Sequence, residues 1–406
     1  MTARLSGQPW LTASATRAVM AALEAAGGPD CARFVGGCVR NSLIGQPVAD
    51  IDIATTLKPE ATDLAIRAAG LKAVPTGIAH GTVTAVADRQ PFEITSLRRD
   101  VSTDGRKATV AFTDDWAEDA ARRDFRLNAL YADAAGQVFD PTGEGVADAL
   151  AGRIIFVGDP ETRIREDFLR ILRFFRFHAW YGRGEPDAAA LAACRELASG
   201  MTRLSAERVS SELMKLLSAP DPRRAMAAMA EAGVLGQILP EGRLTAVFDA
   251  AIDQQGDAVV RLMLLLPPDE GTVRRTAARL RLSNGVRDRL AAAAAAYPAV
   301  DLAMSDAEAR AVLYRDGVPA FSDAVRRRWA EAPESAAGAG RLLALAGAWT
   351  RPRLPVGGRD LARLGMAPGP ETGRVLKAFE AGWIADDFPV SGHTERLAAL
   401  VNPPRG

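Results

Sequence analysis

The sequence predicts an α/β amino-terminal domain, a small mixed sheet with flanking helices, followed by an elongated all-α remainder. Strand and helix patterns alternate before residue 155, strand signals fade after it, and alanine and leucine at helical spacing dominate residues 223–350. A chain of 406 residues exceeds the usual size of one domain. We expect four parts, the last set off by a Pro/Gly-rich break at 351–358: residues 1–155, 156–220, 221–350 and 351–406.

The first part begins with an amphipathic helix at residues 14–26, which Gly27-Gly28 ends. Two short strands at 33–35 and 51–54 surround a helix near 39–44. The later elements follow in chain order: a helix at 59–69, a hairpin of strands at 82–87 and 92–97, a polar and mobile loop at 99–111, a helix at 118–129, and strands near residues 130 and 138.

Capping signals mark the helices of the second half. Residues 166–181 read as one helix with a strongly apolar face. Ser205 is the expected N-cap of a helix that runs to Leu217. Asp221-Pro222 places a cap before a proline at a helix start, and Ser305 and Glu308 have the spacing of a capping box.

Composition excludes several classes of protein. Hydrophobic content of 48% and charged content of 25% are ordinary for a globular chain, and net charge of zero argues against a globally basic nucleic-acid binder. Only five of the 50 basic residues are lysine, and arginine suits bidentate phosphate contacts. Three histidines are too few for a His-Asp metal phosphohydrolase, and three cysteines lack metal-ligand spacing. Without an apolar signal core or a membrane-length run, we expect a cytoplasmic protein.

The most informative motif joins a glycine pair to two carboxylates. Gly36-Gly37 follows a predicted strand and opens a helix, where backbone N–H groups can approach phosphate. Asp50 and Asp52 are two residues apart, so on a strand they project from the same face. Converging carboxylates suit Mg²⁺, which is held by one or two carboxylates plus substrate phosphates. The motif therefore indicates nucleotidyl transfer.

Two arginine clusters follow. In Arg122–Leu130, the expected helix places Asp124 and Asn128 on one face, and Arg123 could bind a triphosphate. An ordinary surface helix with i,i+4 pairs is the alternative.

The second cluster lies in the predicted helix 166–181. Asp167 and Arg170 are one turn apart, so a carboxylate and a guanidinium held by each other could read a base edge. Arg173 and Arg176 continue the same stripe. A salt-bridged amphipathic helix is the alternative here.

Together these motifs resemble the tRNA nucleotidyltransferases (CCA-adding enzymes) and bacterial poly(A) polymerases of the class II branch of the DNA polymerase β superfamily. The resemblance covers about residues 30–217. It is carried by four motifs in order and spacing: Gly36-Gly37-Cys38-Val39-Arg40, Asp50-Ile51-Asp52, Arg122-Arg123-Asp124-Phe125 and Glu166-Asp167-x-x-Arg170.

The resemblance implies roles by position. Asp50 and Asp52 are expected to bind catalytic Mg²⁺, and Glu93 is a candidate third carboxylate near the attacking 3′-hydroxyl, with a strand-face salt bridge as its alternative. Asp167 and Arg170 are expected to read the Watson–Crick edge of the incoming base. The remaining expected nucleotide contacts are Gly37, Arg40, Arg123, Arg173 and Arg176.

The resemblance implies CCA addition to the acceptor end of tRNA from CTP and ATP. Residues 75–81 lack the basic stretch associated with the poly(A) branch, and the tail resembles that of CCA enzymes. Gly365, Gly369 and Gly373 are candidate tRNA contacts in that tail, or else parts of ordinary interhelical turns. No membrane and no obligatory protein partner are expected.

Four alternatives stay open at the level of sequence. They are poly(A) polymerase, a partial CC- or A-adding enzyme, a non-catalytic RNA-binding protein, and a transferase acting on a small molecule or protein. One departure from the family motif is Asn41, where Asp commonly follows Val-Arg. We expect Asn41 to brace its loop.

Overall fold

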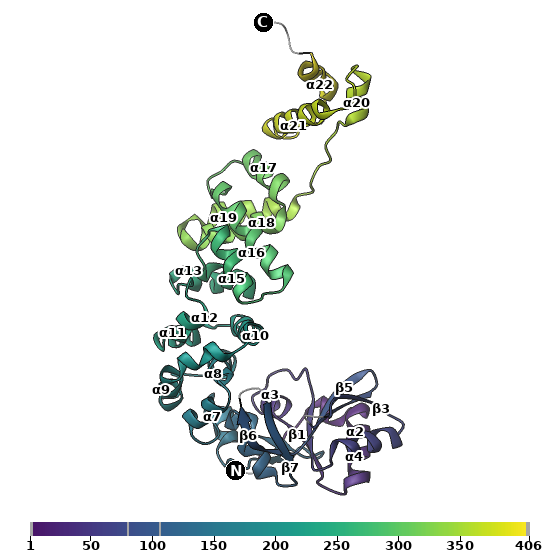
Figure 1. The fold of residues 1–406 in the computed structure, drawn as a ribbon, viewed down its shortest axis with the longest axis vertical. Coiled ribbons are helices and arrows are strands. Elements are labelled where there is room, and N and C mark those ends of the chain that lie inside the picture. The colour runs from purple at the N-terminus through teal and green to yellow at the C-terminus, as the bar shows by residue number, and fades with distance from the viewer. Residues whose placement is uncertain (1–2, 79–80, 105–106, 403–406) are drawn as a thin grey trace. The chain divides into compact units, whose positions relative to one another are not determined.

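The computed structural model describes residues 3–78, 81–104 and 107–402. By internal contacts the chain divides into two compact units, Met1–Pro240 and Glu241–Gly406 (Figure 1). The first unit holds the mixed sheet and its flanking helices, and the second is helical. The predicted order of an α/β part followed by all-α parts is confirmed. The finer division into four parts stays a prediction.

One mixed sheet forms the centre of the head. Its strand order is β3-β4-β5-β2-β1-β8-β9. Strand β2 runs parallel to β5, and the register places Asp52 opposite Glu93. The other neighbouring pairs are antiparallel. The strands are β1 (Ala32–Val35), β2 (Asp52–Thr55), β3 (Lys72–Gly77), β4 (Thr82–Ala87), β5 (Gln90–Ser96), β8 (Tyr131–Ala132) and β9 (Val138–Phe139).

Helices α2 (Ser14–Gly27) and α4 (Pro59–Ala68) pack against each other and against the sheet (Figure 1). Their apolar faces bury side chains such as Leu23 and Ile66, which are fully inaccessible to solvent. Both helices agree with the predicted ranges to within one residue. The other short helices of the head are α1 (Pro9–Thr12), α3 (Gly37–Leu43), α5 (Trp116–Ala121), the 3₁₀ helix η2 (Arg126–Asn128) and α6 (Gly145–Ala151).

Residues 99–104 and 107–111 lie in two paired strands, so the prediction of a loop is wrong for them, while its predicted mobility stays a prediction. Strands β6 (Arg98–Asp104) and β7 (Lys107–Phe112) pair as a separate two-stranded antiparallel sheet. Residues 105–106 lie outside the described chain. The segment carries several β-branched residues and an Asp-Gly pair at its centre, a combination typical of a hairpin.

The predicted helix at 118–129 is wrong beyond Ala121, where α5 ends. Residues Phe125 and Arg126 instead make contacts with a distant segment of the chain. The backbone N–H of Arg126 donates to the carbonyl of Ile155 at 2.9 Å. Phe125 is fully buried, and its ring centroid lies 4.8 Å from that of Phe156. Pairing with a distant segment and burial of Phe125 override the local helical pattern.

The predicted helix at 166–181 is two helices, α7 (Pro160–Glu166) and α8 (Leu169–Tyr181). Asp167 separates them in an extended conformation, with φ −153° and ψ 106°. Its Oδ1 accepts a hydrogen bond from the backbone N–H of Leu169 at 3.1 Å. An aspartate that bonds to nearby backbone in this way competes with helix continuation and favours a new helix start.

The helices that complete the first unit pack around α8. Helix α8 contacts both α10 and α11. The predicted helix ending at Leu217 is confirmed, with Ser205 at the N-cap position, although its hydroxyl makes no capping bond. These helices are α9 (Ala188–Glu196), the 3₁₀ helix η3 (Ala198–Arg203), α10 (Ala206–Leu217), α11 (Arg223–Glu231) and α12 (Val234–Ile238).

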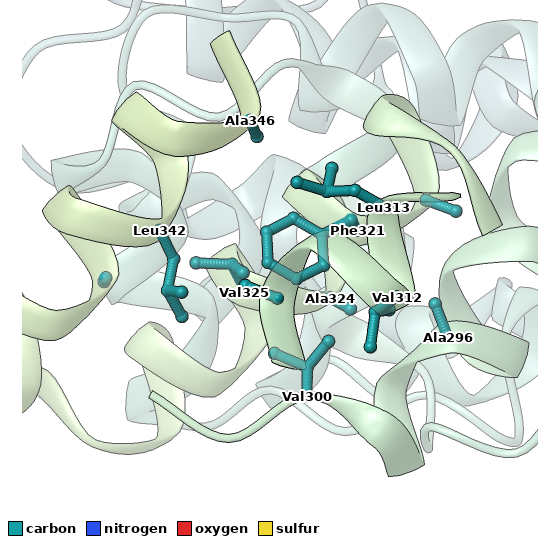
Figure 2. Packing of buried hydrophobic residues seen from close by; sticks show 12 residues of the cluster. Ala296, Val300, Val312, Leu313, Phe321, Ala324, Val325, Leu342 and Ala346 are labelled. Atoms are coloured by element: carbon teal, nitrogen blue, oxygen red, sulfur yellow. The ribbon is translucent and has the colours of Figure 1, made fainter. Parts of the chain in front are cut away.

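Two apolar clusters lie among the described residues of the second unit. Phe321 is fully buried at the centre of the first, among Val300, Leu313 and Leu342 (Figure 2). The second gathers around Trp383. It contains Tyr314, Val356, Leu361, Val375, Phe379, Trp383 and Leu397.

The predicted capping box at Ser305 is present. The backbone N–H of Ser305 donates to Glu308 Oε2 at 2.7 Å, and the backbone N–H of Glu308 donates to Ser305 Oγ at 3.3 Å. The helices of this unit are α13 (Ala246–Asp253), α14 (Ala258–Leu265), α15 (Glu270–Arg279), α16 (Asn284–Ala296), η4 (Tyr297–Ala299), α17 (Asp306–Asp316), α18 (Val318–Glu331), η5 (Pro333–Ser335), α19 (Ala336–Ala348), α20 (Gly358–Arg363), α21 (Pro370–Ala385) and α22 (His393–Val401).

Throughout the described residues, no helix combines the length and the apolar character needed to cross a membrane.

Candidate active site

A glycine turn between β1 and α3 forms one side of the candidate site. Gly36 has φ +69°, a left-handed conformation that favours glycine, and its N–H donates to the carbonyl of Leu130 at 3.1 Å. A Cβ added at Gly36 would lie 3.9 Å from Nη1 of Arg123. Gly37, the predicted nucleotide contact, is the first residue of α3. The position that requires glycine for its backbone is therefore Gly36, which the sequence analysis did not select.

Of the three predicted carboxylates, Asp52 begins β2, Glu93 lies on β5, and Asp50 precedes β2 by two residues. Ile51 is buried, Asp52 is half-buried and Asp50 is exposed, so the two aspartates flank a side chain that enters the core. Glu93 is exposed and is the register partner of Asp52 on β5. The structure thus brings Asp50, Asp52 and Glu93 to one region of the sheet.

These carboxylates interact electrostatically. Burial and the nearby charges of Glu93 and Asp50 together raise the pKa of Asp52 to about 6, against the opposing charge of Arg123. A bound cation would relieve this repulsion, and oxygen ligands are the ones that Mg²⁺ prefers. Within the described residues, no group of three or more His, Cys, Asp or Glu side chains is arranged to hold a metal ion. Two carboxylates that act together with substrate phosphates are a donor set that Mg²⁺ commonly uses.

Arg123 lies next to the carboxylates and is held by Asp119. Its Nε and Nη2 donate to Asp119 Oδ2 at 3.1 and 3.0 Å, and its Nε also lies 3.1 Å from the hydroxyl of Tyr131. Burial raises the pKa of Asp119, but the charges of Arg123 and Arg122 outweigh it and the net pKa lies below the ordinary value. Asp119 was missed in the sequence analysis, although its i,i+4 spacing from Arg123 is a local signal.

Asp167 and Arg170 do not hold each other, so that part of the prediction is wrong. Asp167 Oδ2 accepts a hydrogen bond from Arg208 Nη2 at 2.7 Å. Arg170 forms an ion pair with Glu166 and donates to the carbonyl of Arg163 at 2.7 Å. Asp167 lies between α7 and α8, where its carboxylate oxygens accept from the backbone N–H of Leu169 and from Arg208 instead of from Arg170. Arg208 lies 41 residues further along the chain, and no local pattern could have identified it as the partner.

Arg40 is turned inward. It is 6% exposed, and it donates to Asn128 Oδ1 and, at 2.9 Å, to the hydroxyl of Tyr181. Its Nε and Nη2 also donate to Asn41 Oδ1 at 3.1 and 2.9 Å. The amide of Asn41 donates in turn to the carbonyl of Pro47 at 2.8 Å, so Asn41 braces the loop that leads to Asp50, as the sequence analysis expected.

Arg173 and Arg176 are also engaged within the protein. Arg173 Nε donates to Asp124 Oδ2 at 2.8 Å, and Arg176 Nε lies 2.7 Å from Glu212 Oε2. Burial raises the pKa of Asp124, but the charge and hydrogen bonds of Arg173 outweigh it and leave the pKa at about 2. Asn128 adds a hydrogen bond to Asp124 at 3.2 Å, although the helix from which their proximity was predicted ends at Ala121. The predicted nucleotide contacts of Arg40, Arg173 and Arg176 stay predictions.

The three tail glycines lie in the second unit. Gly365 follows α20 with φ +84°, Gly369 is the N-cap of α21, and Gly373 is in the first turn of α21. All three are exposed, and a Cβ at any of them would meet no atom within 4 Å. Their predicted contacts with tRNA stay predictions.

Comparisons with known proteins agree with this layout. Residues 32–155 match the family model described as the poly A polymerase head domain. Residues 185–244 match the model described as a probable RNA and SrmB binding site of polymerase A. The second match falls on the helices that follow α8.

Relatives extend the similarity over most of the chain. The chain is 32% identical over 377 residues to CCA tRNA nucleotidyltransferase 1, mitochondrial, of Danio rerio, covering 88% of this chain and 84% of that protein. It is 41% identical over 200 residues to the CCA-adding enzyme of Streptococcus pyogenes, covering 49% and 48%. The fold is similar to that of the Bacillus stearothermophilus CCA-adding enzyme in complex with CTP, with a TM-score of 0.73, 24% identity and coverage of 93% and 94%.

The ion pair between Asp124 and Arg173 predicts a pH dependence of stability. Because the folded-state pKa of Asp124 is about 2, below its ordinary value of 3.8, the pair contributes fully above about pH 4 and is lost as pH falls through 2. We expect Asp124→Asn to remove about 2 kcal/mol of that acid-dependent stability. The measurement is the urea unfolding midpoint of both proteins between pH 2 and 6, in steps of about half a unit.

Asp63→Asn is the matched control. Asp63 pairs with Arg67 at 2.7 Å on the exposed side of α4, where solvent screens the charges. Its pH profile should follow the wild type to within a few tenths of a kcal/mol. An Asp124→Asn profile parallel to the wild type would contradict the assignment of the pKa shift to this pair.

Asn41 gives a second test of the packing around Arg40. Asp at this position keeps both acceptor contacts to Arg40 and adds a compensating charge, but it cannot donate to Pro47. Ala loses all of these bonds and leaves a buried guanidinium with fewer acceptors, at a cost of about 1–3 kcal/mol. We expect thermal unfolding midpoints in the order wild type, Asn41→Asp, Asn41→Ala. An Asp variant as unstable as the Ala variant would show that the bond to Pro47 carries the effect instead.

Proposed function

Because the chain belongs to the CCA tRNA nucleotidyltransferase family, we propose that it adds and repairs the 3′-terminal CCA of tRNA, using CTP and ATP and releasing pyrophosphate. The observation that carries this proposal is the match to the Danio rerio enzyme over 88% of the chain, which includes the helical parts as well as the head. Solved relatives described as complexes with CTP, with ATP and with tRNA support the same substrates.

The carboxylates of β2 and β5 form the proposed reaction centre. Nucleotidyltransferases of this family use a divalent metal ion. We assign it to Mg²⁺, held by Asp50 and Asp52, where it would supply activation of the attacking 3′-hydroxyl and neutralisation of phosphate charge. Glu93, the register partner of Asp52, is the proposed third carboxylate near the attacking 3′-hydroxyl. No covalent enzyme intermediate is required, because the reaction is an in-line displacement at the α-phosphate.

The glycine turn and Arg123 are proposed to bind the triphosphate. Asp119 and Tyr131 fix the guanidinium of Arg123, so little side-chain freedom is lost when phosphate binds. The absence of a Cβ at Gly36 lets phosphate approach the backbone next to that guanidinium. A fixed positive charge beside the leaving pyrophosphate stabilises the charge that develops in the transition state.

Asp167 is the proposed reader of the incoming base, together with Arg170. Arg208 positions the Asp167 carboxylate from α10, and Glu166 positions Arg170. The helices of the second unit and the glycines of its tail are proposed to hold the tRNA acceptor arm through phosphate and shape contacts. A cytoplasmic location stays a prediction, since the relatives include mitochondrial and bacterial enzymes.

The decisive experiment is nucleotide incorporation on a tRNA that lacks its 3′-CCA, with Mg²⁺ and CTP alone, ATP alone, or both. Two residues from CTP, a third only with ATP, and then a stop are expected. The match to the poly A polymerase head domain makes poly(A) addition the second candidate. A long ladder of extended RNA products from ATP alone would establish poly(A) addition in place of CCA addition. A stop after CC with both nucleotides present would mean a partial enzyme.

Asp50→Ala and Asp52→Ala test the metal assignment. We expect each to lower kcat by about a thousandfold or more, because transition-state charge is left uncompensated. Binding of tRNA should persist, and Asp63→Ala on the surface of α4 should leave kcat unchanged. Retained turnover in both active-site variants would contradict the assignment.

Asp167→Ala and Arg208→Ala test base reading. The first variant removes the proposed base reader, and the second removes the residue that positions it. Both should lower the ratio of kcat/KM for CTP to kcat/KM for ATP at the first addition. For Asp167→Ala we expect a decrease of about tenfold or more. Arg165, which pairs with Glu161 on the exposed side of α7, provides the control variant Arg165→Ala. Unchanged nucleotide preference in Asp167→Ala would remove the base-reading role.

A further inference from the structure

A cavity lies between the second half of α8 and the end of α10, and of its lining residues only Arg176 is among the expected nucleotide contacts. Its volume is about 240 Å³, and it is lined by Arg176, Phe177, Trp180, Tyr181, Lys215 and Ser218. It is smaller than the roughly 300–1,000 Å³ of typical small-molecule sites. This size suits one planar ring system better than a complete nucleoside triphosphate.

Aromatic side chains form one wall of the cavity. Trp180 is 42% exposed, which is unusual for so large an apolar side chain, and its ring centroid lies 6.4 Å from that of Tyr181. The indole N–H donates to the carbonyl of Lys215 at 2.8 Å, which fixes the orientation of the ring. A fixed and exposed indole loses little conformational freedom when a flat ligand stacks on it.

Positive charge lies beside this wall. The side chain of Lys215 is exposed, and its ammonium lies 4.0 Å from Oε1 of Glu212. Nε of Arg176 lies 2.7 Å from Oε2 of the same carboxylate. Two cations and one buried carboxylate leave a net charge of +1 beside the cavity. A cationic and aromatic site is complementary to a nucleotide that offers a base to stack and a phosphate to neutralise.

The cavity is joined to the candidate active site by a direct contact. Tyr181, which lines it, accepts a hydrogen bond at 2.9 Å from Arg40, three residues after Gly37. Because both belong to the same compact unit, a strand that ends at the carboxylates of β2 could place an earlier nucleotide here.

We propose that this cavity binds one unpaired nucleotide of the tRNA acceptor strand, upstream of the reacting 3′ end, with its base stacked on Trp180 and its phosphate beside Lys215. This inference rests on the proposed function, since it assigns part of the RNA substrate to a place on the enzyme. The incoming CTP or ATP offers the same base and phosphate chemistry, and the test separates the two sources.

Trp180→Ala and Trp180→Phe are compared with the wild type in steady-state kinetics on tRNA lacking CCA. Stacking of one base on an aromatic ring is strong enough that its loss should raise KM for tRNA by about tenfold. Phe keeps a stacking surface and should stay within about threefold of the wild type. The KM for CTP and kcat at saturating tRNA should stay unchanged, and thermal unfolding midpoints confirm that each variant is folded.

Lys215→Gln tests the phosphate contact without removing the aromatic wall. Loss of one contact to single-stranded RNA should reduce the slope of log Kd against log salt concentration by about 0.7. Lys72→Gln, at an exposed lysine of β3, is the matched control and should leave that slope unchanged.

Two results would overturn the proposal. Unchanged KM for tRNA in Trp180→Ala would show that nothing stacks on this ring. A raised KM for CTP with unchanged KM for tRNA would assign the cavity to the incoming nucleotide.

Failure of the proposed function would give a different result, since the wild-type protein itself would then add no CMP to tRNA. In that case, fluorescence anisotropy with a labelled single-stranded RNA decides the inference alone. Binding that Trp180→Ala weakens supports the cavity, and equal binding by both proteins overturns it.

Discussion

The ion pair between the buried Asp124 and the half-buried Arg173 is the interaction on which the arrangement of the first unit depends. It joins the segment after α5 to the middle of α8, and Asn128 extends it by bonding both to Asp124 and to Arg40. Removing one partner of such a pair leaves an uncompensated buried charge, and this destabilises the fold by more than the intact pair stabilises it. These hydrogen-bonded side chains therefore favour one arrangement of the sheet relative to α8. Phe125, packed against Phe156 and Phe177, supplies the apolar part of the same contact.

A second constraint is the repulsion among the carboxylates at β2 and β5. The sheet register forces Asp52 opposite Glu93, and the buried Ile51 forces Asp50 and Asp52 outward together. The fold therefore holds like charges close to one another, an arrangement that stores unfavourable electrostatic energy until a cation or Arg123 offsets it. Asp119, by fixing Arg123 beside them, belongs to this arrangement as much as the carboxylates do.

The three arginines of α8 are spaced three residues apart in the sequence, but each binds a different partner within the protein. Arg170 is tied to Glu166 and to the backbone of Arg163, Arg173 to Asp124, and Arg176 to Glu212. Each guanidinium thus has an internal acidic partner from a different element. The three arginines that the resemblance assigns to nucleotide binding therefore also form the ion pairs that connect α8 with α7, α10 and the head.

The sequence by itself determined the elements whose signals are local. The glycine turn, the alternation at Asp50 and Asp52, helices α2 and α4, and the capping box at Ser305 all follow from spacing within a few residues. Only the tertiary structure decided the features that depend on distant partners. Phe125 is taken out of a helix by burial against Phe156, Asp167 binds Arg208, and Arg40 turns inward to Tyr181. At Phe125 the long-range contact exceeds the small energy of local helix propensity, and for Asp167 and Arg40 no pattern within the segment records the distant partner.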